Sequence, residues 1–154
     1  MRIKIRRAQA KDLAFINSLT DCMQNYLAGL YGLKPSEKDL EEEHYDEDDL
    51  EETLVAEDAE TRIVAGYLSF SLRRDEWAGP HFELEHLVVR EDYKRLGVAT
   101  KLCRALEGKA KHKKVNITAG TLVRNKGALK FYKKLGFKPL TVNVLLDVQK
   151  RMRR

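Results

Sequence analysis

The chain has 154 residues, of which 43% are hydrophobic and 34% are charged, and its formal net charge is +5. These values fit one globular domain over residues 1–154, and no run of about 18 apolar residues is present that could cross a membrane. The basic N-terminal residues lack the apolar stretch of a secretory signal, and the only cysteines, Cys22 and Cys103, lie in apolar helical patterns. We therefore expect a cytoplasmic protein with reduced core thiols and no disulfide, metal or membrane function.

The charges are distributed unevenly along the chain. Between Glu37 and Glu60 there are 14 acidic residues and one basic residue, whereas from Lys109 to the C-terminus there are 14 basic residues and one acidic residue. Such runs are commonly solvated surface, and that interpretation stays open. The alternative is a protein that binds a polyanion on one side and a cation on another.

The first half of the chain alternates between helical and strand periodicity. Apolar residues recur with helical spacing over 10–30, and glycines and a proline mark the end of that stretch. The acidic segment 40–50 is expected to be helical or partly mobile. Period-two alternation or continuous apolar runs predict strands at 3–5, 53–57, 63–72 and 82–89.

The second half continues this alternation. The pattern predicts a helix over 98–110, a strand over 115–121, a helix over 125–135 that Gly136 ends, and a last strand over 141–148. The resulting order is β-α-(α)-β-β-β-α-β-α-β. Such an order predicts a mixed α/β sheet with helices on its faces.

A strand, a basic turn and a helix follow one another in the segment Glu83 to Glu107. The turn contains one glycine, Gly97, and Ala99 keeps the first helical turn free of bulky side chains. Backbone N–H groups at such a helix start can hold a pyrophosphate without a metal. A plain connecting turn would look the same, and neither a P-loop nor a dinucleotide-binding glycine pattern is present.

A second segment, Thr121 to Phe137, adds specificity to the first. After the strand the chain reads Lys94-Arg95-Leu96-Gly97-Val98-Ala99, and about 30 residues later Asn125, Ala128, Tyr132, Gly136 and Phe137 stand in the pattern N-x-x-A-x-x-x-Y-x-x-x-G-F. Over roughly residues 53–140 these paired motifs resemble those of the GNAT superfamily of N-acetyltransferases. Lys94 departs from the arginine or glutamine usual there, although lysine still offers a phosphate a point charge.

The resemblance implies a GNAT fold, with a mostly antiparallel mixed sheet and a splayed strand pair that holds acetyl-CoA. The pantetheine arm would pair with the main chain of Leu87, Val88 and Val89. The pyrophosphate would lie on the backbone from Arg95 to Thr100, through Leu96, Gly97, Val98 and Ala99, with Lys94 beside it. Asn125, Ala128 and Tyr132 would contact the cofactor, and Asn125 could equally be a helix N-cap.

The resemblance also implies which residues handle protons. Glu85 looks like a glutamate that serves the substrate amine in polyamine acetyltransferases, with Glu83 as the reserve, and either could instead be a solvent-facing carboxylate. Tyr132 stands where the family has the acid that protonates the departing thiolate, and could instead be a core aromatic. The N–H of Leu87 or Val88 would polarise the thioester carbonyl.

The acceptor is less narrowly defined. The acidic segment borders the acceptor site in this family, so a cationic amine is favoured, with a polyamine slightly ahead of an aminoglycoside or the N-terminus or lysine of a basic protein. Two non-enzymatic interpretations stay open: a nucleic-acid-binding module that uses the basic C-terminal third, and a domain that binds coenzyme A as a sensor. A homodimer is expected from the resemblance.

Overall fold

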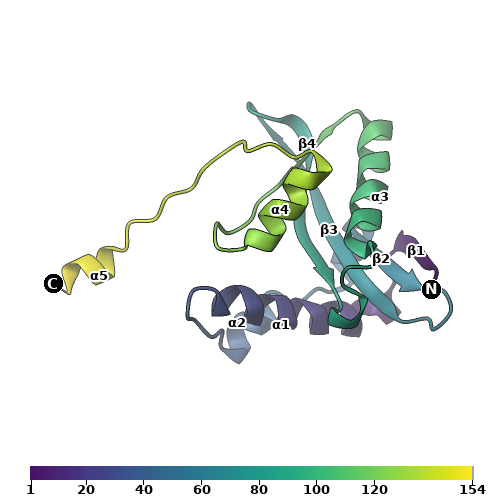
Figure 1. Ribbon diagram of the computed structural model, residues 1–154, viewed down its shortest axis with the longest axis horizontal. Coiled ribbons are helices and arrows are strands. Elements are labelled where there is room, and N and C mark those ends of the chain that lie inside the picture. Colours follow the sequence, from purple (N-terminus) through teal and green to yellow (C-terminus); the bar gives the residue numbers. More distant parts are fainter. Residues whose placement is uncertain (154) are drawn as a thin grey trace.

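The computed structural model describes residues 1–153 and consists of a five-stranded sheet with helices on both faces (Figure 1). The strands lie in chain order and are β1 (Ile3–Arg7), β2 (Thr53–Asp58), β3 (Val64–Asp75), β4 (Gly79–Val89) and β5 (Asn116–Ala119). Neighbours are antiparallel from β1 to β4, and β5 is parallel to β4. The predicted mixed and mostly antiparallel sheet is therefore confirmed.

The helices lie in the connections between these strands. They are α1 (Leu13–Gly29), α2 (Glu37–Glu42), α3 (Val98–Lys113), α4 (Lys126–Leu135) and α5 (Val148–Met152), and short 3-10 helices occupy Ala10–Asp12, Glu47–Glu52 and Glu91–Tyr93. The acidic segment thus forms α2 and the second 3-10 helix. Ser36 caps α2, because its hydroxyl accepts a hydrogen bond from the Asp39 N–H at 3.1 Å.

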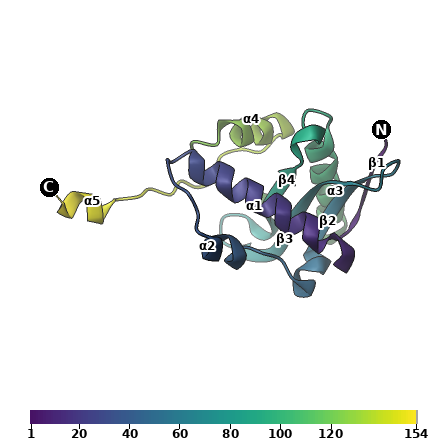
Figure 2. The same ribbon diagram turned by 90° about the horizontal axis from the view of Figure 1, so that it is seen from below.

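Alternation along the strands divides the core between the two faces of the sheet. On one face Ile16 and Leu19 of α1 pack against Val55, Tyr67 and Val88. On the other face α3 buries Leu102 and Leu106 against apolar strand residues that include Leu54, Leu68, Phe70 and Leu84. Helices α1 and α3 therefore cover opposite faces of the sheet (Figure 2).

Two predictions about the chain are wrong. The predicted strand 141–148 is an extended segment followed by α5, and it leads away from the sheet in both views (Figures 1 and 2). A strand needs a neighbour for its backbone hydrogen bonds, and this segment has none within the described chain. Cys103 is buried as expected, but Cys22 is exposed, because it lies on the solvent side of α1.

Within residues 1–153, no helix is both long and apolar enough to span a membrane. The same residues contain no group of three or more His, Cys, Asp or Glu side chains that could hold a metal ion.

Candidate active site

Strands β4 and β5 pair over only part of their length. The parallel register runs from His81 opposite Asn116 to Leu84 opposite Ala119, and β5 ends there. β4 continues to Val89 while its other edge stays paired with β3. The backbone of Leu87, Val88 and Val89 therefore has no strand beside it on the β5 side, which is the splayed strand pair that the sequence predicts.

The turn after β4 is shaped by two left-handed residues. Arg95 has φ +65° and Gly97 has φ +81°, and Gly97 is the N-cap of α3. Glycine adopts this conformation without the steric cost that other residues carry. The first N–H groups of α3, from Val98 onward, have no partner within the helix and are available at its N-terminus.

Side chains around this turn place basic groups beside the helix start. The Lys94 ammonium lies 2.8 Å from a Glu91 carboxylate oxygen and is half-exposed, so it is partly neutralised yet free to move to a phosphate. Arg95 and Leu96 are exposed, Val98 is buried beneath the turn, and Ala99 and Thr100 are partly buried. Of the predicted residues 94–100, all but the buried Val98 therefore reach the surface at the helix N-terminus.

Helix α4 carries the second predicted group. The Asn125 side chain accepts a hydrogen bond from the Ala128 N–H at 3.3 Å, so Asn125 is the N-cap that the sequence predicts as one of its roles. Tyr132 packs against Phe131 and Phe137, with ring centroids 5.5 and 5.1 Å away. Burial, together with the neighbouring Cys103, raises the pKa of Tyr132 above its usual value. Tyr132 therefore keeps its proton at neutral pH.

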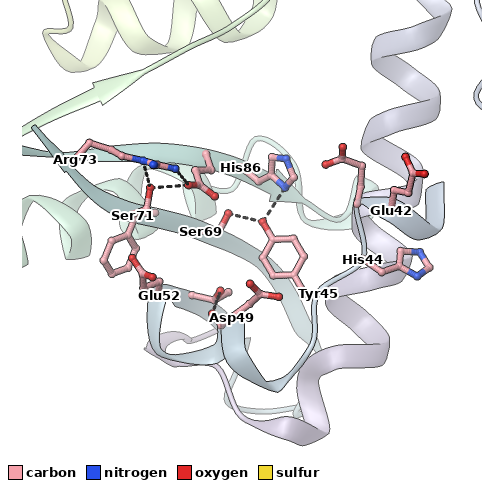
Figure 3. Close-up of a pocket in the computed structure, with 13 residues that line it drawn as sticks. Glu42, His44, Tyr45, Asp49, Glu52, Ser69, Ser71, Arg73 and His86 are labelled. Carbon is pink, nitrogen blue, oxygen red and sulfur yellow. Dashed lines mark hydrogen bonds and ion pairs between the residues drawn. The ribbon is translucent and has the colours of Figure 1, made fainter. Parts of the chain in front are cut away.

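An acidic cavity lies on the face of the sheet that α1 and α2 border, and Figure 3 shows the side chains that line it. Its volume is about 390 Å³. Five carboxylates line it, from the acidic segment and from β4: Glu42, Glu43, Asp49, Glu52 and Glu85. The acidic segment thus surrounds a cavity that is suited to a cation.

The two predicted carboxylates of β4 share an arginine. The Ser71 hydroxyl donates to Glu85 at 2.6 Å, and Arg73 lies 3.8 Å from the same carboxylate oxygen of Glu85 and 3.4 Å from Glu83 (Figure 3). The structure therefore places Glu83 and Glu85 on one face of the sheet, as expected. Only Glu85 lines the cavity.

His86 lines the same cavity, and sequence analysis missed it. Strict alternation would send His86 to the face opposite Glu85. The pairing of β3 with β4 instead shifts by one residue, from Phe70 opposite Leu84 to Ser69 opposite His86, so that Glu85 is the extra residue of a β-bulge. The bulge brings Glu85 and His86 to one face, directly before Leu87 in the chain.

Tyr45 also lines the cavity and comes from the loop after α2. Its backbone is held by Asn17 of α1, whose amide accepts from the Tyr45 N–H at 2.7 Å and donates to the Tyr45 carbonyl at 3.1 Å. Its hydroxyl lies 2.8 Å from Nδ1 of His86 and 2.5 Å from the Ser69 hydroxyl. No motif in the sequence points to Tyr45, because its role depends on a loop that folds over the sheet.

The predicted site residues fall into two groups. The first group comprises Glu85, which lines the cavity, and the residues that follow it in the chain, namely the splayed segment 87–89 and the turn 94–100. Tyr132 lies on α4 beside Cys103 of the opposite core and does not line the cavity. A substrate in the cavity and Tyr132 would therefore approach the splayed strand from different sides.

A splayed strand pair, a glycine turn that opens a helix and a cavity beside them define an acyl-coenzyme A-dependent transferase fold. The sequence model of the acetyltransferase (GNAT) family matches residues 15–137. The chain belongs to this family and is an acetyl-CoA-dependent N-acetyltransferase, with acetyl-CoA as its co-substrate. A search among curated protein sequences gives no match.

Solved structures share the fold at low sequence identity. A complex of AAC(6')-Iy with the bisubstrate analog CoA-S-monomethyl-acetylneamine is 19% identical, with a TM-score of 0.70, 95% of this chain covered and 97% of that chain. A mutant of the BH1408 protein from Bacillus halodurans is 17% identical, with a TM-score of 0.78 and coverages of 93% and 98%. An integron cassette protein from V. cholerae is 16% identical, with a TM-score of 0.68 and coverages of 100% and 99%.

Proposed function

We propose that this acetyltransferase transfers the acetyl group to a primary amine of a cationic acceptor, with a polyamine-like small amine preferred. The observation that supports the proposal is the cavity of about 390 Å³, which five carboxylates line. Two of its lining residues, Glu85 and His86, directly precede the splayed end of β4 in the chain. Several carboxylates around a small cavity favour a ligand with more than one positive charge.

The co-substrate would be held mainly by backbone groups. Leu87 and Val89 offer main-chain donors and acceptors on the unpaired edge of β4, which suits the amides of a pantetheine arm, whereas the backbone groups of Val88 face β3. The turn from Arg95 to Thr100 offers the N-terminus of α3 to the pyrophosphate, with the Lys94 ammonium beside it. Asn125 and Ala128, at the start of α4, would contact the pantetheine arm of the co-substrate.

The proposed reaction needs a neutral amine, because an ammonium has no lone pair. Glu85 would draw the ammonium into the cavity and receive its proton directly or through a water, with Glu83 as the reserve. The amine nitrogen would then attack the thioester carbon, and the N–H of Leu87 would donate to the thioester oxygen; the Val88 N–H faces β3 and does not serve. When the C–S bond breaks, Tyr132 would protonate the thiolate, and the second proton, which the nitrogen loses as the amide forms, would pass through water to the tyrosinate.

An aminoglycoside is the second candidate acceptor. A solved neighbour of the same fold binds an acetylneamine analog joined to coenzyme A, and aminoglycosides are also polycationic amines. The N-terminus or a lysine of a basic protein is the third candidate. The charge of the cavity suits all three, and its volume of about 390 Å³ favours the smallest.

We also propose a homodimer in which the C-terminal segment 140–148, here named the arm, pairs with a second copy. Val142, Val144 and Leu146 of the arm are 82%, 93% and 63% exposed, and they recur at every second residue, which suits a strand. β5 is an edge strand, and the next helix, α4, leaves Leu129 42% exposed although its Phe131, Tyr132 and Leu135 pack against the core. An arm from the second copy would cover both of these surfaces.

The function is tested by measuring acetyl-CoA-dependent thiol release with spermidine, an aminoglycoside, a small monoamine and a basic peptide. We expect release with spermidine at the lowest acceptor concentration. Acetyl-CoA binding without release for any amine would favour the sensor. Steeply salt-dependent binding of duplex DNA, unaffected by acetyl-CoA, would favour the nucleic-acid module.

A further inference from the structure

The side chain of His86 is held from one side only. Its Nδ1 lies 2.8 Å from the Tyr45 hydroxyl and 3.4 Å from the Tyr67 hydroxyl (Figure 3). Tyr67 is fixed in turn by the buried Thr20 hydroxyl at 2.6 Å. Two tyrosines from different parts of the chain therefore set the orientation of the imidazole ring.

The other ring nitrogen, Nε2, faces accessible space. Among residues 1–153, Nε2 of His86 has no hydrogen-bond partner, and no buried side-chain nitrogen or oxygen in this range lacks one. Nε2 is therefore reached by solvent, and His86 lines the acidic cavity. The ring is fixed through one nitrogen and presents the other to whatever enters the cavity.

Glu85, the neighbouring candidate base, is in a different situation. Its carboxylate accepts the Ser71 hydroxyl at 2.6 Å and lies 3.8 Å from the Arg73 guanidinium, so two donors already occupy it. As classes of side chain, carboxylates are weaker bases than imidazoles, whose reference pKa is about 6.5. The better-matched proton acceptor at neutral pH is the imidazole.

We propose that His86, in place of Glu85, accepts the proton of the acceptor ammonium at Nε2, and that Glu85 only holds the ammonium by charge; this inference rests on the proposed amine acetylation and replaces the base named there. One N–H bond of the ammonium breaks and the Nε2–H bond forms, which leaves a neutral amine and an imidazolium. The amine then attacks the thioester. Nδ1–H donates to the Tyr45 oxygen, so Tyr45 is a positioning residue, and the imidazolium later returns its proton to solvent.

The charged and titratable groups around His86 fit this assignment. Burial lowers the pKa of His86, and the carboxylates of Glu43, which directly follows α2, and Glu85 from β4 partly offset that lowering. Tyr45 and Tyr67, whose pKa values are raised by burial, stay neutral. His86 is therefore neutral at pH 7, and it becomes protonated only at a pH below the ordinary range of an imidazole.

The test compares wild-type protein with His86→Asn over about pH 4.5 to 10, a range that includes the protonation of an imidazole whose pKa is lowered, by acetyl-CoA-dependent thiol release with the acceptor that the amine panel identifies. Asparagine retains a polar atom near the position of Nδ1, so the contact with Tyr45 can persist, but it lacks Nε2. We expect kcat/KM to fall by about 10²-fold at pH 7. The deficit should shrink toward pH 10, where a free amine with a pKa of about 10.4 loses its proton unaided.

The matched control is Glu85→Gln, which keeps the Ser71 hydrogen bond and removes the charge. It should raise KM for a polycation and leave the acidic limb of the pH profile in place. A deficit of His86→Asn that is equal at every pH would overturn the inference, as would loss of the acidic limb in Glu85→Gln alone. Wild-type protein that acetylates no amine would instead refute the proposed function. Thermal unfolding and acetyl-CoA binding measurements check that the His86→Asn variant folds.

Discussion

At the scale of single residues, the environments of two side chains separate the proposed acid from the proposed base. Burial raises the pKa of Tyr132, so the phenol keeps its proton and can only donate it. Burial lowers the pKa of His86, so the imidazole is neutral and can only accept. The pKa values of these two groups, which lie on either side of β4, are thus shifted in opposite directions. Such a difference is a physical basis for assigning the acid role to one group and the base role to the other.

The acid role of Tyr132 is tested by Tyr132→Phe. Phenylalanine preserves the ring contacts with Phe131 and Phe137, so the fold and acetyl-CoA binding should be unchanged. We expect kcat to fall by about 10²-fold because the thiolate loses its proton donor. Steady-state kinetics at saturating acetyl-CoA measure this, and Phe131→Leu, which alters the same aromatic cluster without removing a hydroxyl, is the control. An unchanged kcat would show that Tyr132 is a core aromatic only.

At the scale of secondary-structure elements, periodicity predicted most of the fold. The helices over 98–110 and 125–135 and the central strands appear within a few residues of their predicted bounds, because apolar spacing reports which face is buried. The arm shows where this reasoning fails. The alternation of apolar and other residues in the arm is compatible with a strand. The pattern within one chain does not say, however, whether a neighbouring strand is present for it to pair with.

The candidate site was predictable in part for the same reason. The turn around Gly97 and the cap at Asn125 depend on local conformation, which residue types reveal directly. His86 and Tyr45 depend on a one-residue bulge in β4 and on a loop anchored by Asn17, respectively. Neither has a local signature, because each depends on contacts between distant parts of the chain.

The arm is tested by Val144→Asp combined with Leu146→Asp. Both residues are exposed in the single chain, so the change should not unfold the domain. We expect wild-type protein to sediment at twice the chain mass of 17.8 kDa and the double variant at that mass, because buried unpaired charges oppose strand pairing. Asn143→Asp adds a charge without removing an apolar side chain and should stay dimeric. Wild-type protein that sediments as a single chain at tens of micromolar would contradict the proposal.

At the scale of the whole molecule, opposite charges are separated onto the two binding regions. The acidic segment contributes Glu42, Glu43, Asp49 and Glu52 to the cavity, whereas the turn at the start of α3 carries Lys94 and Arg95. The net charge of +5 conceals this separation. Each region would attract one of two oppositely charged substrates and repel the other, which keeps coenzyme A out of the acceptor cavity.

This separation predicts how the acceptor responds to salt. The cavity carboxylates attract a polyamine partly through solvent, and the range of that attraction falls to about 10 Å at 0.1 M salt. With acetyl-CoA saturating, KM for spermidine should therefore rise several-fold between about 20 and 200 mM NaCl, while kcat stays constant because the charges act on capture. A monoamine acceptor is the control and should respond much less, since it presents a single charge to five carboxylates. The double variant Asp49→Asn with Glu52→Gln should reduce the salt response of spermidine toward that of the monoamine. Equal salt responses for the two acceptors would mean that the carboxylates are only solvated surface, and that the shape of the cavity, not its charge, selects the acceptor.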